Sequence, residues 1–384
     1  MNLTIASVEA IALAAPFSKM FDEVPEWLLT PASSHRVLPR LGQYTTLVRI
    51  RTVDGLEGIG EAYGLPEPRV TATIIGQLLA PMLVGRDAGA SEALWELMFG
   101  AQASAGRTGG FYLEAISGID LALWDLRGKA AGQPVHRLLG GPVRTTVPVY
   151  ASPIPFLPTT AESVQTALSF VDDGFHAVKL KLGRGETTDL AHATAVADAL
   201  DGRAALHVDL NCAYDVKTAI RLAHALEGIG VRWFEEPLST DDVEGLAEVR
   251  AAVRIPVVTG ESEFIRYGYR NLLLARAADV VMPNLTRAGG ITEARRIAAL
   301  CSAFHVDVSP HGVGSAVGLA AALQLAAATP NVTSLEYNRL PNPLRDDLAT
   351  PPSLVDGALV VSEEPGLGVT LDEDLIAHYE VFRA

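Results

Sequence analysis

Apolar and polar positions divide the chain into two parts with different periodicities. The first part combines strand-like runs with amphipathic helical stretches, which predicts an α+β module. The predicted strands span residues 4–13, 44–52 and 58–62, and the predicted helices span residues 70–79, 91–99 and 113–131. Residues 16–40 lack periodicity and contain Trp27 among several prolines. A loop of this length in a compact domain predicts a lid over a site.

From residue 146 onward, short apolar runs alternate with Ala- and Leu-rich helical stretches. The runs are VPVYAS, HAVKLKL, AALHVDL, VRWFEEP, IPVVTGE, ADVVMPN, FHVDVSPH and VTSLEYN. Eight such alternations over roughly 200 residues predict a modified TIM (β/α)₈ barrel. We therefore predict an α/β protein with a capping domain over residues 1–140, a barrel over 145–350, and a C-terminal segment over 351–384 that packs back on the capping domain.

Polar or charged side chains end the predicted barrel strands from the second to the eighth. They are Lys179 and Lys181, Asp209 with Asn211, Glu235, Glu261, Asn284, His311 and Glu336. Catalytic groups of this fold project from the C-terminal ends of different strands into one mouth. One βα unit separates each position from the next, so we expect these side chains to meet.

Three of these residues are carboxylates on consecutive strands, namely Asp209, Glu235 and Glu261. Charges at the end of an apolar strand are costly to bury unless they pair or bind a metal. The three offer only hard oxygen ligands, which suits Mg²⁺ better than zinc or copper. The alternative is that each one pairs with a neighbouring basic residue.

Lys179 and Lys181 are two residues apart on a strand, so their side chains point the same way. Two nearby ammonium groups lower each other's pKa, and a lysine with a lowered pKa can act as a base near neutral pH. The alternative is a solvated strand edge, which is the usual meaning of this pattern when it stands alone.

The charge balance excludes several classes of partner. Thirty Lys and Arg stand against 45 Asp and Glu, a net charge of −15, which predicts no binding to nucleic acid or to an anionic membrane. Two cysteines are too few for a disulfide framework or a cysteine-based zinc site. The N-terminus lacks the basic start of a signal peptide, and the apolar run at 316–328 is too short to span a bilayer. These features predict a cytoplasmic protein.

The order KLK, VDLN, FEEP, GE, MPN…GG, SPHG and LEY resembles the enolase superfamily, in particular its mandelate racemase-like subgroup (the mandelate racemase/muconate lactonizing enzyme family). The resemblance covers nearly the whole chain. It implies a capping domain that closes over the barrel mouth, and a homo-oligomer. It also implies a small-molecule carboxylate as substrate, whose α-proton is removed to give a metal-stabilised enediolate.

The same resemblance implies a role for each strand-end residue. Asp209, Glu235 and Glu261 would hold Mg²⁺, which binds the substrate carboxylate. Lys181 would be the base, and Lys179 would lower its pKa. His311 would be a second base, or the acid that assists departure of a β-hydroxyl. Glu336 would hydrogen-bond the substrate carboxylate, and Asn211 would contact the substrate. From their place in the predicted lid, and not from the resemblance, we expect Trp27 and Arg36 to reach the substrate.

One position departs from the subgroup, because Asn284 stands where an Asp usually orients the histidine. An Asn can accept a hydrogen bond from a ring N–H, but it supplies no negative charge to stabilise an imidazolium. We therefore expect His311 to be a weak base, which disfavours a two-base racemase. One-base chemistry on Lys181 is unaffected.

Three functions remain open at this point. The leading hypothesis is Mg²⁺-dependent dehydration of a sugar acid to a 2-keto-3-deoxy acid, which makes the protein a lyase. The alternative enzyme is a racemase or epimerase at the α-carbon of a hydroxy or amino acid. The third hypothesis is a non-catalytic binder whose Asn284 records lost chemistry. A nicotinamide site at residues 312–318 is disfavoured, because the glycines read GxGxxxG instead of GxGxxG.

Overall fold

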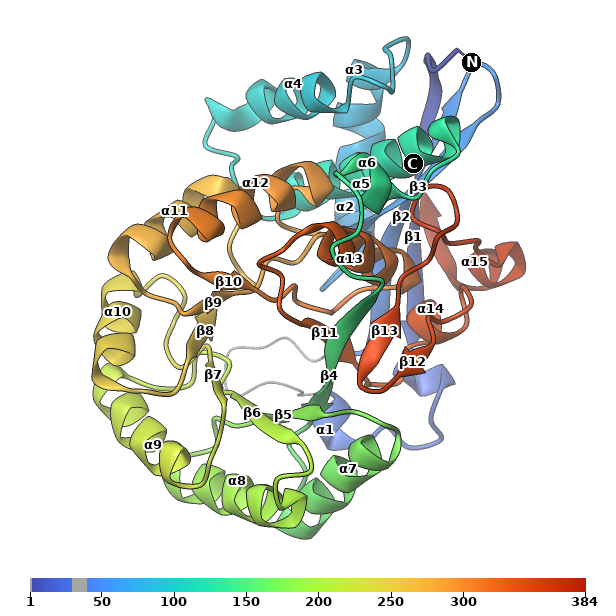
Figure 1. Cartoon of the computed structure of the whole chain (residues 1–384). Coiled ribbons are helices and arrows are strands. Elements are labelled where there is room, and N and C mark those ends of the chain that lie inside the picture. The colour runs from blue at the N-terminus through green and yellow to red at the C-terminus, as the bar shows by residue number, and fades with distance from the viewer. Residues whose placement is uncertain (1, 30–39) are drawn as a thin grey trace.

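Two sheets organise the chain, and they correspond to the two periodicities of the sequence. The computed structural model describes residues 2–29 and 40–384. The first sheet is antiparallel, with strand order β14-β1-β2-β3. Its strands are β1 (Ile5–Pro16), β2 (Gly42–Thr52), β3 (Glu57–Tyr63) and β14 (Glu380–Arg383). The second sheet is a ring of parallel strands with helices on its outside (Figure 1).

The helices of the N-terminal part pack against the first sheet or against one another. They are α2 (Pro68–Ile74) with a π-helical turn (Ile75–Leu79), α3 (Ala80–Leu83), α4 (Ser91–Ala103), α5 (Phe111–Ala131) and α6 (Val135–Leu138). Helix α5 is buried over most of its length and lies against β3. A Cβ on Gly60 of β3 would lie 2.0 Å from the carbonyl oxygen of Gly118 in α5. Glycine at residue 60 therefore permits this close approach of helix and strand.

All eight predicted barrel strands are present, which confirms the predicted fold class. They are β4 (Thr146–Ile154), β5 (Ala177–Lys181), β6 (Ala205–Asp209), β7 (Trp233–Glu235), β8 (Val257–Thr259), β9 (Val280–Val281), β10 (Asp307–Val308) and β11 (Leu335–Asn338). Strands β4 to β10 pair in sequence order, and β11 pairs with the other edge of β4. A parallel bridge between Val308 and Val332 brings β10 beside the residues that lead into β11.

Helices alternate with these strands on the outside of the ring (Figure 1). They are α7 (Thr160–Asp172), α8 (Glu186–Leu200), α9 (Val216–Gly228), α10 (Val243–Ala252), α11 (Ile265–Ala275), α12 (Gly290–Ala303), α13 (Ala316–Ala328) and the short α14 (Pro343–Asp346). Each long helix buries an apolar face in the main hydrophobic core between helices and strands. The mouth is thus built on a rigid frame.

The C-terminal segment contributes to both sheets. Its last strand, β14, pairs with β1 of the first sheet. Its hairpin of β12 (Leu354–Val355) and β13 (Ala358–Val360) instead pairs antiparallel with β4 of the barrel. The helix α15 (Glu373–Tyr379) lies between them in the chain and contacts β1. The domain boundaries at residues 140, 145 and 350 stay predictions.

A buried carboxylate of the first sheet holds the barrel loop that follows His311. Glu61 of β3 accepts hydrogen bonds from the backbone N–H of Ser315 at 2.7 Å, from the Ser315 hydroxyl at 2.6 Å and from the N–H of Gly318 at 2.6 Å. These groups form the N-terminus of α13, where unpaired N–H groups favour an anion. The capping part of the chain therefore helps to position one wall of the barrel mouth.

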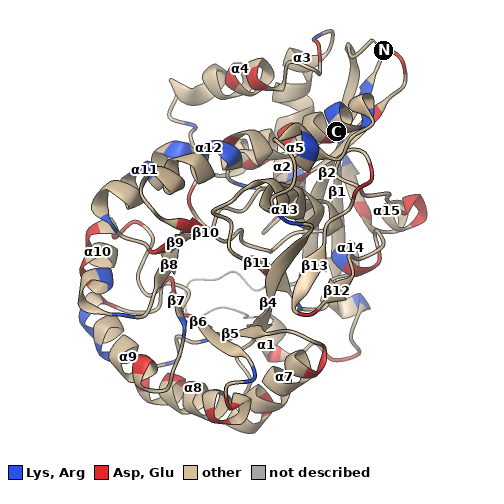
Figure 2. Cartoon of the chain, viewed as in Figure 1, with Lys and Arg blue, Asp and Glu red and all other residues tan. Residues whose placement is uncertain are grey.

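The surface is mixed in charge, as Figure 2 shows for the outer helices, where Lys and Arg are interspersed with Asp and Glu. In the part of the chain that the structure describes, no helix is both long and apolar enough to cross a membrane.

Asp120 makes the interface between α5 and α12 sensitive to pH. Its Oδ2 accepts from the backbone N–H of Thr292 at 2.9 Å, whereas its Oδ1 has no partner among the described residues. Burial raises the pKa of Asp120 to about 7. The unfolded chain loses this proton near pH 4, so the carboxyl lowers stability as pH rises from about 4 to 7. We expect Asp120→Asn to be more stable than the wild type at pH 8, by about 2 to 4 kcal/mol, and to lose this advantage at pH 4.

Thermal unfolding at both pH values measures this difference. Asp198→Asn on the exposed surface of α8 is the matched control and should not change the pH profile. A gain for Asp120→Asn that is the same at pH 4 and pH 8 would contradict the explanation.

Candidate active site

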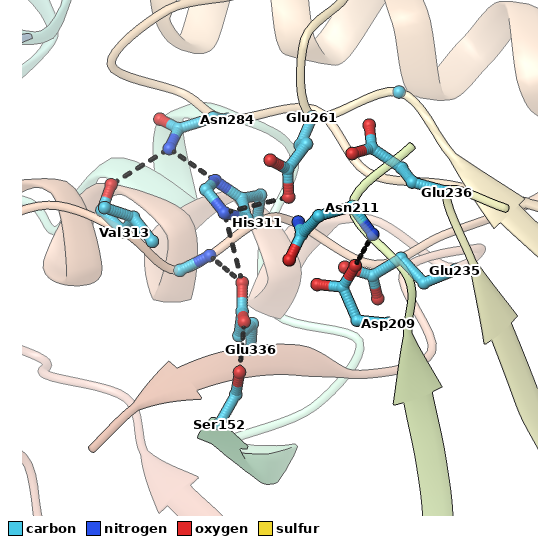
Figure 3. Close-up of polar contacts among 12 residues, drawn as sticks. Ser152, Asp209, Asn211, Glu235, Glu236, Glu261, Asn284, His311, Val313 and Glu336 are labelled. Carbon is cyan, nitrogen blue, oxygen red and sulfur yellow. Dashed lines mark hydrogen bonds and ion pairs between the residues drawn. The ribbon is translucent and has the colours of Figure 1, made fainter. Parts of the chain in front are cut away.

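The predicted strand-end residues meet at the barrel mouth. Asp209 and Glu235 are the last residues of β6 and β7, and Glu261 follows β8 by two residues. Asn284 and His311 lie in the loops after β9 and β10, and Glu336 lies in β11. Figure 3 shows Glu261, His311, Asn211 and Asp209 with their side chains converging on one space. The spacing of one βα unit between sites correctly predicted this convergence.

Asp209, Glu235 and Glu261 form a compact set of three carboxylates. Each offers an oxygen atom, and these three atoms all lie within 4.8 Å of one another. Asp209 and Glu235 are fully buried, and Glu235 also accepts from the indole N–H of Trp233 at 2.7 Å. An all-oxygen donor set of this size fits a hard cation such as Mg²⁺.

Two lysines pair with these carboxylates. Lys179 has no exposed surface, and its Nζ lies 2.6 Å from Glu235, 2.9 Å from Glu336 and 3.3 Å from Asp209. Lys181 exposes 13% of its side chain, and its Nζ lies 2.5 Å from Asp209 Oδ2. Lys181 therefore faces the open mouth, while Lys179 acts as a buried counter-charge.

Lys179 lowers the pKa of Lys181, as predicted, but the pKa of Lys181 as a whole is raised and not lowered. Burial and Lys179 both oppose the charged form of Lys181, but Asp209, Glu261 and Glu235 outweigh them and raise its pKa above the ordinary value. The sequence could not reveal this balance, because it depends on the 2.5 Å contact with Asp209.

Negative charge exceeds positive charge at this end of the barrel. The acidic groups are Asp209, Glu235, Glu236, Glu261 and Glu336, and the lysines are Lys179 and Lys181. Burial and the charge of Asp209 raise the pKa of Glu235 well above its ordinary value, and burial and Glu261 do the same for Glu236. A divalent cation among these carboxylates would offset their mutual repulsion and favour their ionised forms, so the residues present fit such an ion.

Glu236 is a member of the site that sequence reasoning missed. It is 3% exposed, and its Oε1 has no hydrogen-bond partner among the described residues. In a regular strand, it would point away from Glu235. Its φ of 40° breaks that alternation, and Figure 3 shows its carboxylate beside Glu261. A left-handed glutamate is uncommon, and no sequence signal predicts it.

Asn284 contacts the ring of His311, as the sequence predicts from the family pattern (Figure 3). The Asn284 Oδ1 accepts from the backbone N–H of Thr286 at 2.9 Å and from its hydroxyl at 2.7 Å. The Asn284 Nδ2 donates to the Val313 carbonyl at 2.9 Å and lies 2.9 Å from His311 Nδ1. The N–H of Thr286 can only donate and the carbonyl of Val313 can only accept, so together they determine the amide orientation. Asn284 therefore donates to the ring, although an asparagine can also accept from a ring N–H.

The ring of His311 is thereby oriented toward the mouth. Since Nδ1 accepts, a neutral His311 carries its proton on Nε2. That nitrogen lies 3.2 Å from Glu261 Oε2 and 3.5 Å from Glu336 Oε2. An N–H that points into the mouth can donate a hydrogen bond to an oxygen of a bound molecule.

Glu336 is held by four groups. Its carboxylate accepts from the hydroxyl of Ser152 at 2.5 Å and from the N–H of Gly312 at 2.9 Å, and it pairs with Lys179 and His311. Although burial opposes ionisation, Lys179 and His311 hold the pKa of Glu336 below its ordinary value. An ionised Glu336 can only accept hydrogen bonds, so its partner on a substrate would be a hydroxyl group. The sequence instead predicts a contact with the substrate carboxylate, which has no hydrogen to donate when it is ionised.

A cavity of about 700 Å³ opens above these residues. Lys181, Asn211, Glu261, His311 and Glu336 line its inner end. Its outer end is lined by Arg40, Tyr44, Tyr63 and Glu67, which belong to the first sheet or to segments beside its strands; Ser152 of β4 and Asn338 of β11 also line the cavity. Its volume lies in the usual range for small-molecule sites.

Of the two predicted lid residues, Trp27 and Arg36, only Trp27 is among the described residues. Trp27 lies in the helical turn α1 (Glu26–Leu29) and packs against an apolar cluster that includes Phe17 and Leu340. It is not among the described residues that line the cavity, so its contact with substrate stays a prediction. Arg36 lies outside the described residues.

Comparison with known proteins adds a family context. Residues 162–375 match the model of an enolase C-terminal domain-like family, and residues 34–140 match the N-terminal domain of mandelate racemase / muconate lactonizing enzyme. The chain is 35% identical to D-galactarolactone cycloisomerase from Agrobacterium fabrum, over 87% of this chain and 91% of that one.

Two further relatives are named as dehydratases. L-talarate/galactarate dehydratase from Salmonella typhimurium is 33% identical over 90% of this chain and 86% of that one. D-xylonate dehydratase from Haloferax volcanii is 32% identical over 87% and 85%. Among solved structures, a racemase from Streptomyces coelicolor with bound magnesium is 29% identical, covers 98% of this chain and 100% of that one, and superposes with a TM-score of 0.88.

Proposed function

The chain belongs to the enolase superfamily and has a mandelate racemase / muconate lactonizing enzyme N-terminal domain, and on that premise we propose that it is a Mg²⁺-dependent sugar-acid dehydratase. The reaction would remove the α-proton and the β-hydroxyl of the acid to give a 2-keto-3-deoxy acid. Relatives named L-talarate/galactarate dehydratase and D-xylonate dehydratase support this class of reaction. A small-molecule sugar acid is the corresponding partner.

Asp209, Glu235 and Glu261 would hold the cation, because their oxygen atoms form the compact donor set described above. When bound there, Mg²⁺ supplies a positive charge that holds the substrate carboxylate, stabilises the negative charge that develops as the α-proton leaves, and offsets the carboxylates that raise the pKa of Lys181. The buried Lys179 would keep Glu235 and Glu336 paired and in place.

Lys181 would move the proton. Its Nζ reaches the cavity, and in its neutral form it can take the α-proton, whose bonding electron pair stays on the carbon skeleton. That pair forms a C=C bond as the C–O bond to the β-hydroxyl breaks. The Lys181 ammonium returns its proton to the departing oxygen, so water leaves. The remaining enol converts to the 2-keto acid, and the lysine is neutral again.

The contact between Asn284 and His311 carries the choice of a dehydratase over a racemase. A racemase needs a second base on the opposite face, and His311 could serve only if Nε2 had a free electron pair. The Asn284 donor at Nδ1 favours the opposite tautomer, with the proton on Nε2. His311 would therefore donate a hydrogen bond to the substrate, while Lys181 alone moves protons.

The non-catalytic alternative is less favoured, because Lys181 and all three carboxylates of the triad are in place around a cavity. Assembly as a homo-oligomer and a cytoplasmic location stay predictions.

Asn284→Asp tests the proposal. A panel of aldonic and aldaric acids and their lactones is incubated in D₂O with Mg²⁺, and mass spectrometry and NMR follow products and recovered substrate. We expect the wild type to form a 2-keto acid and no C2 epimer. In Asn284→Asp, the carboxylate would accept from Nδ1–H and free Nε2 as a base. We expect a deuterated C2 epimer to appear and dehydration to fall about 10- to 100-fold.

Asn271→Asp, which adds the same charge on the exposed side of α11, is the control and should match the wild type. If no member of the panel yields a 2-keto acid, the dehydratase proposal is wrong. If the wild type already forms the epimer, the racemase alternative replaces it.

A further inference from the structure

Arg40 lies at the outer end of the cavity, away from the carboxylates and lysines. Its backbone N–H donates to the Leu29 carbonyl at 2.9 Å, which places it beside α1. Its guanidinium donates from Nη2 to the side-chain oxygen of Gln43 and from Nε to the Gly42 carbonyl at 3.3 Å. Gln43 is itself held, because its Nε2 donates to the Pro341 carbonyl at 2.7 Å. The guanidinium is therefore fixed in direction, with Nη1 not engaged by any described residue.

No described carboxylate pairs with this guanidinium. Burial lowers the pKa of Arg40, and Tyr63 and Tyr44 offset this only in part. Glu67 lines the same cavity, but it accepts from the N–H of Arg69 and has the Arg69 guanidinium 3.7 Å away. A half-buried cation without a counter-ion is costly unless a ligand brings the negative charge.

Several side chains at this end of the cavity have a hydrogen-bond donor that no described residue engages. Asn338 uses its Oδ1 for the N–H of Leu340 and for Arg345, so its Nδ2 remains as a donor. The hydroxyls of Tyr44 and Tyr63 also line this end, and no hydrogen bond of either is found within the described residues. The nearby Arg345 is already paired with Asp346 at 2.7 Å. This arrangement favours an acceptor-rich anion.

The cavity thus has two poles that each suit a carboxylate. The inner pole carries the triad, which would bind a carboxylate through Mg²⁺, with Lys181 beside it, and the outer pole carries Arg40 and Asn338. The relatives leave the choice open, because their names include both a galactarate dehydratase and a D-xylonate dehydratase, whose substrates have two carboxylates and one, respectively.

We propose that Arg40 binds the second carboxylate of the substrate, which makes the preferred substrate class an aldarate. This inference rests on the proposed function, since it identifies the acid that the same site would dehydrate. The guanidinium would form a charge-assisted hydrogen bond through Nη1, and Asn338 would supply a second donor.

The test compares an aldarate with the aldonate of the same configuration, for example galactarate with galactonate. For the wild type, we expect kcat/KM to be at least about 10-fold higher for the diacid. Arg40→Met should lower kcat/KM for the diacid about 10- to 100-fold and change the value for the monoacid less than about 3-fold. Arg40→Lys keeps the charge and should fall between the two.

Arg221→Met, which removes an exposed arginine of α9, is the matched control and should leave both substrates unchanged. The inhibition constants of a non-reacting dicarboxylate and of its monocarboxylate analogue measure the same preference with compounds that are not themselves converted. Equal loss of both substrates in a folded Arg40→Met would overturn the role of Arg40 while the dehydratase proposal stands. Failure of the wild type to dehydrate any member of the aldonate and aldarate panel would instead remove the proposed function itself.

Discussion

Lys181→Met is expected to lower kcat for dehydration by about 10⁴-fold while leaving the fold intact. The reason is that one lysine both takes the α-proton and returns it to the departing oxygen, so both steps lose their proton carrier. The substitution also removes the ammonium that lies 2.5 Å from Asp209 Oδ2. A cation at Asp209 would then meet less repulsion, so Mg²⁺ binding should be retained or strengthened. Single-turnover kinetics and calorimetric Mg²⁺ titration measure the two effects separately.

Lys217→Met is the matched control, because Lys217 lies on the exposed face of α9. It should behave as the wild type in both measurements. A Lys181→Met enzyme that keeps more than about a tenth of the wild-type kcat would show that another group removes the proton. Loss of both turnover and Mg²⁺ binding would mean that Lys181 mainly supports the carboxylates.

The strand-end residues could be predicted from the sequence because barrel geometry converts spacing into proximity. Residues such as Asp209, Glu235 and Glu261 each follow an apolar run, and each is one βα unit from the next. The direction of a strand and its right-handed connection to the next then bring their side chains to one mouth. The convergence of these side chains can therefore be predicted from the order of apolar runs and helical stretches alone.

Other properties of the site depend on contacts that the sequence does not specify. The amide orientation of Asn284 is determined by Thr286 and by Val313, which comes from another loop. Glu236 points into the site because of its positive φ, which breaks the alternation of a strand. The pairing of β13 with β4 likewise joins distant parts of the chain, and no pattern in the sequence indicates this contact of the C-terminal segment with the barrel.

Removal of divalent cations is expected to abolish turnover, and Mg²⁺ is expected to restore it. Within the triad, Glu261 is the clearest position to test. Asp209 and Glu235 also pair with lysines, whereas the side chain of Glu261 lies 3.2 Å from His311. We expect Glu261→Gln to weaken Mg²⁺ binding at least about 100-fold, since it removes one of three charged ligands. Saturating Mg²⁺ should stabilise the wild type by about 3 kcal/mol at 100 times its Kd, and this gain should vanish in Glu261→Gln.

Glu263→Gln provides a control two residues away, because Glu263 is outside the triad and should keep the Mg²⁺-dependent rise in Tm. The thermal measurement separates metal binding from catalysis, since it needs no substrate. A Glu261→Gln variant that behaves as Glu263→Gln would place the cation elsewhere. Full turnover after exhaustive chelation would mean that Lys181 and the protein dipoles alone stabilise the developing charge. The buried carboxylates around Glu235 would then need a positive charge other than a divalent cation.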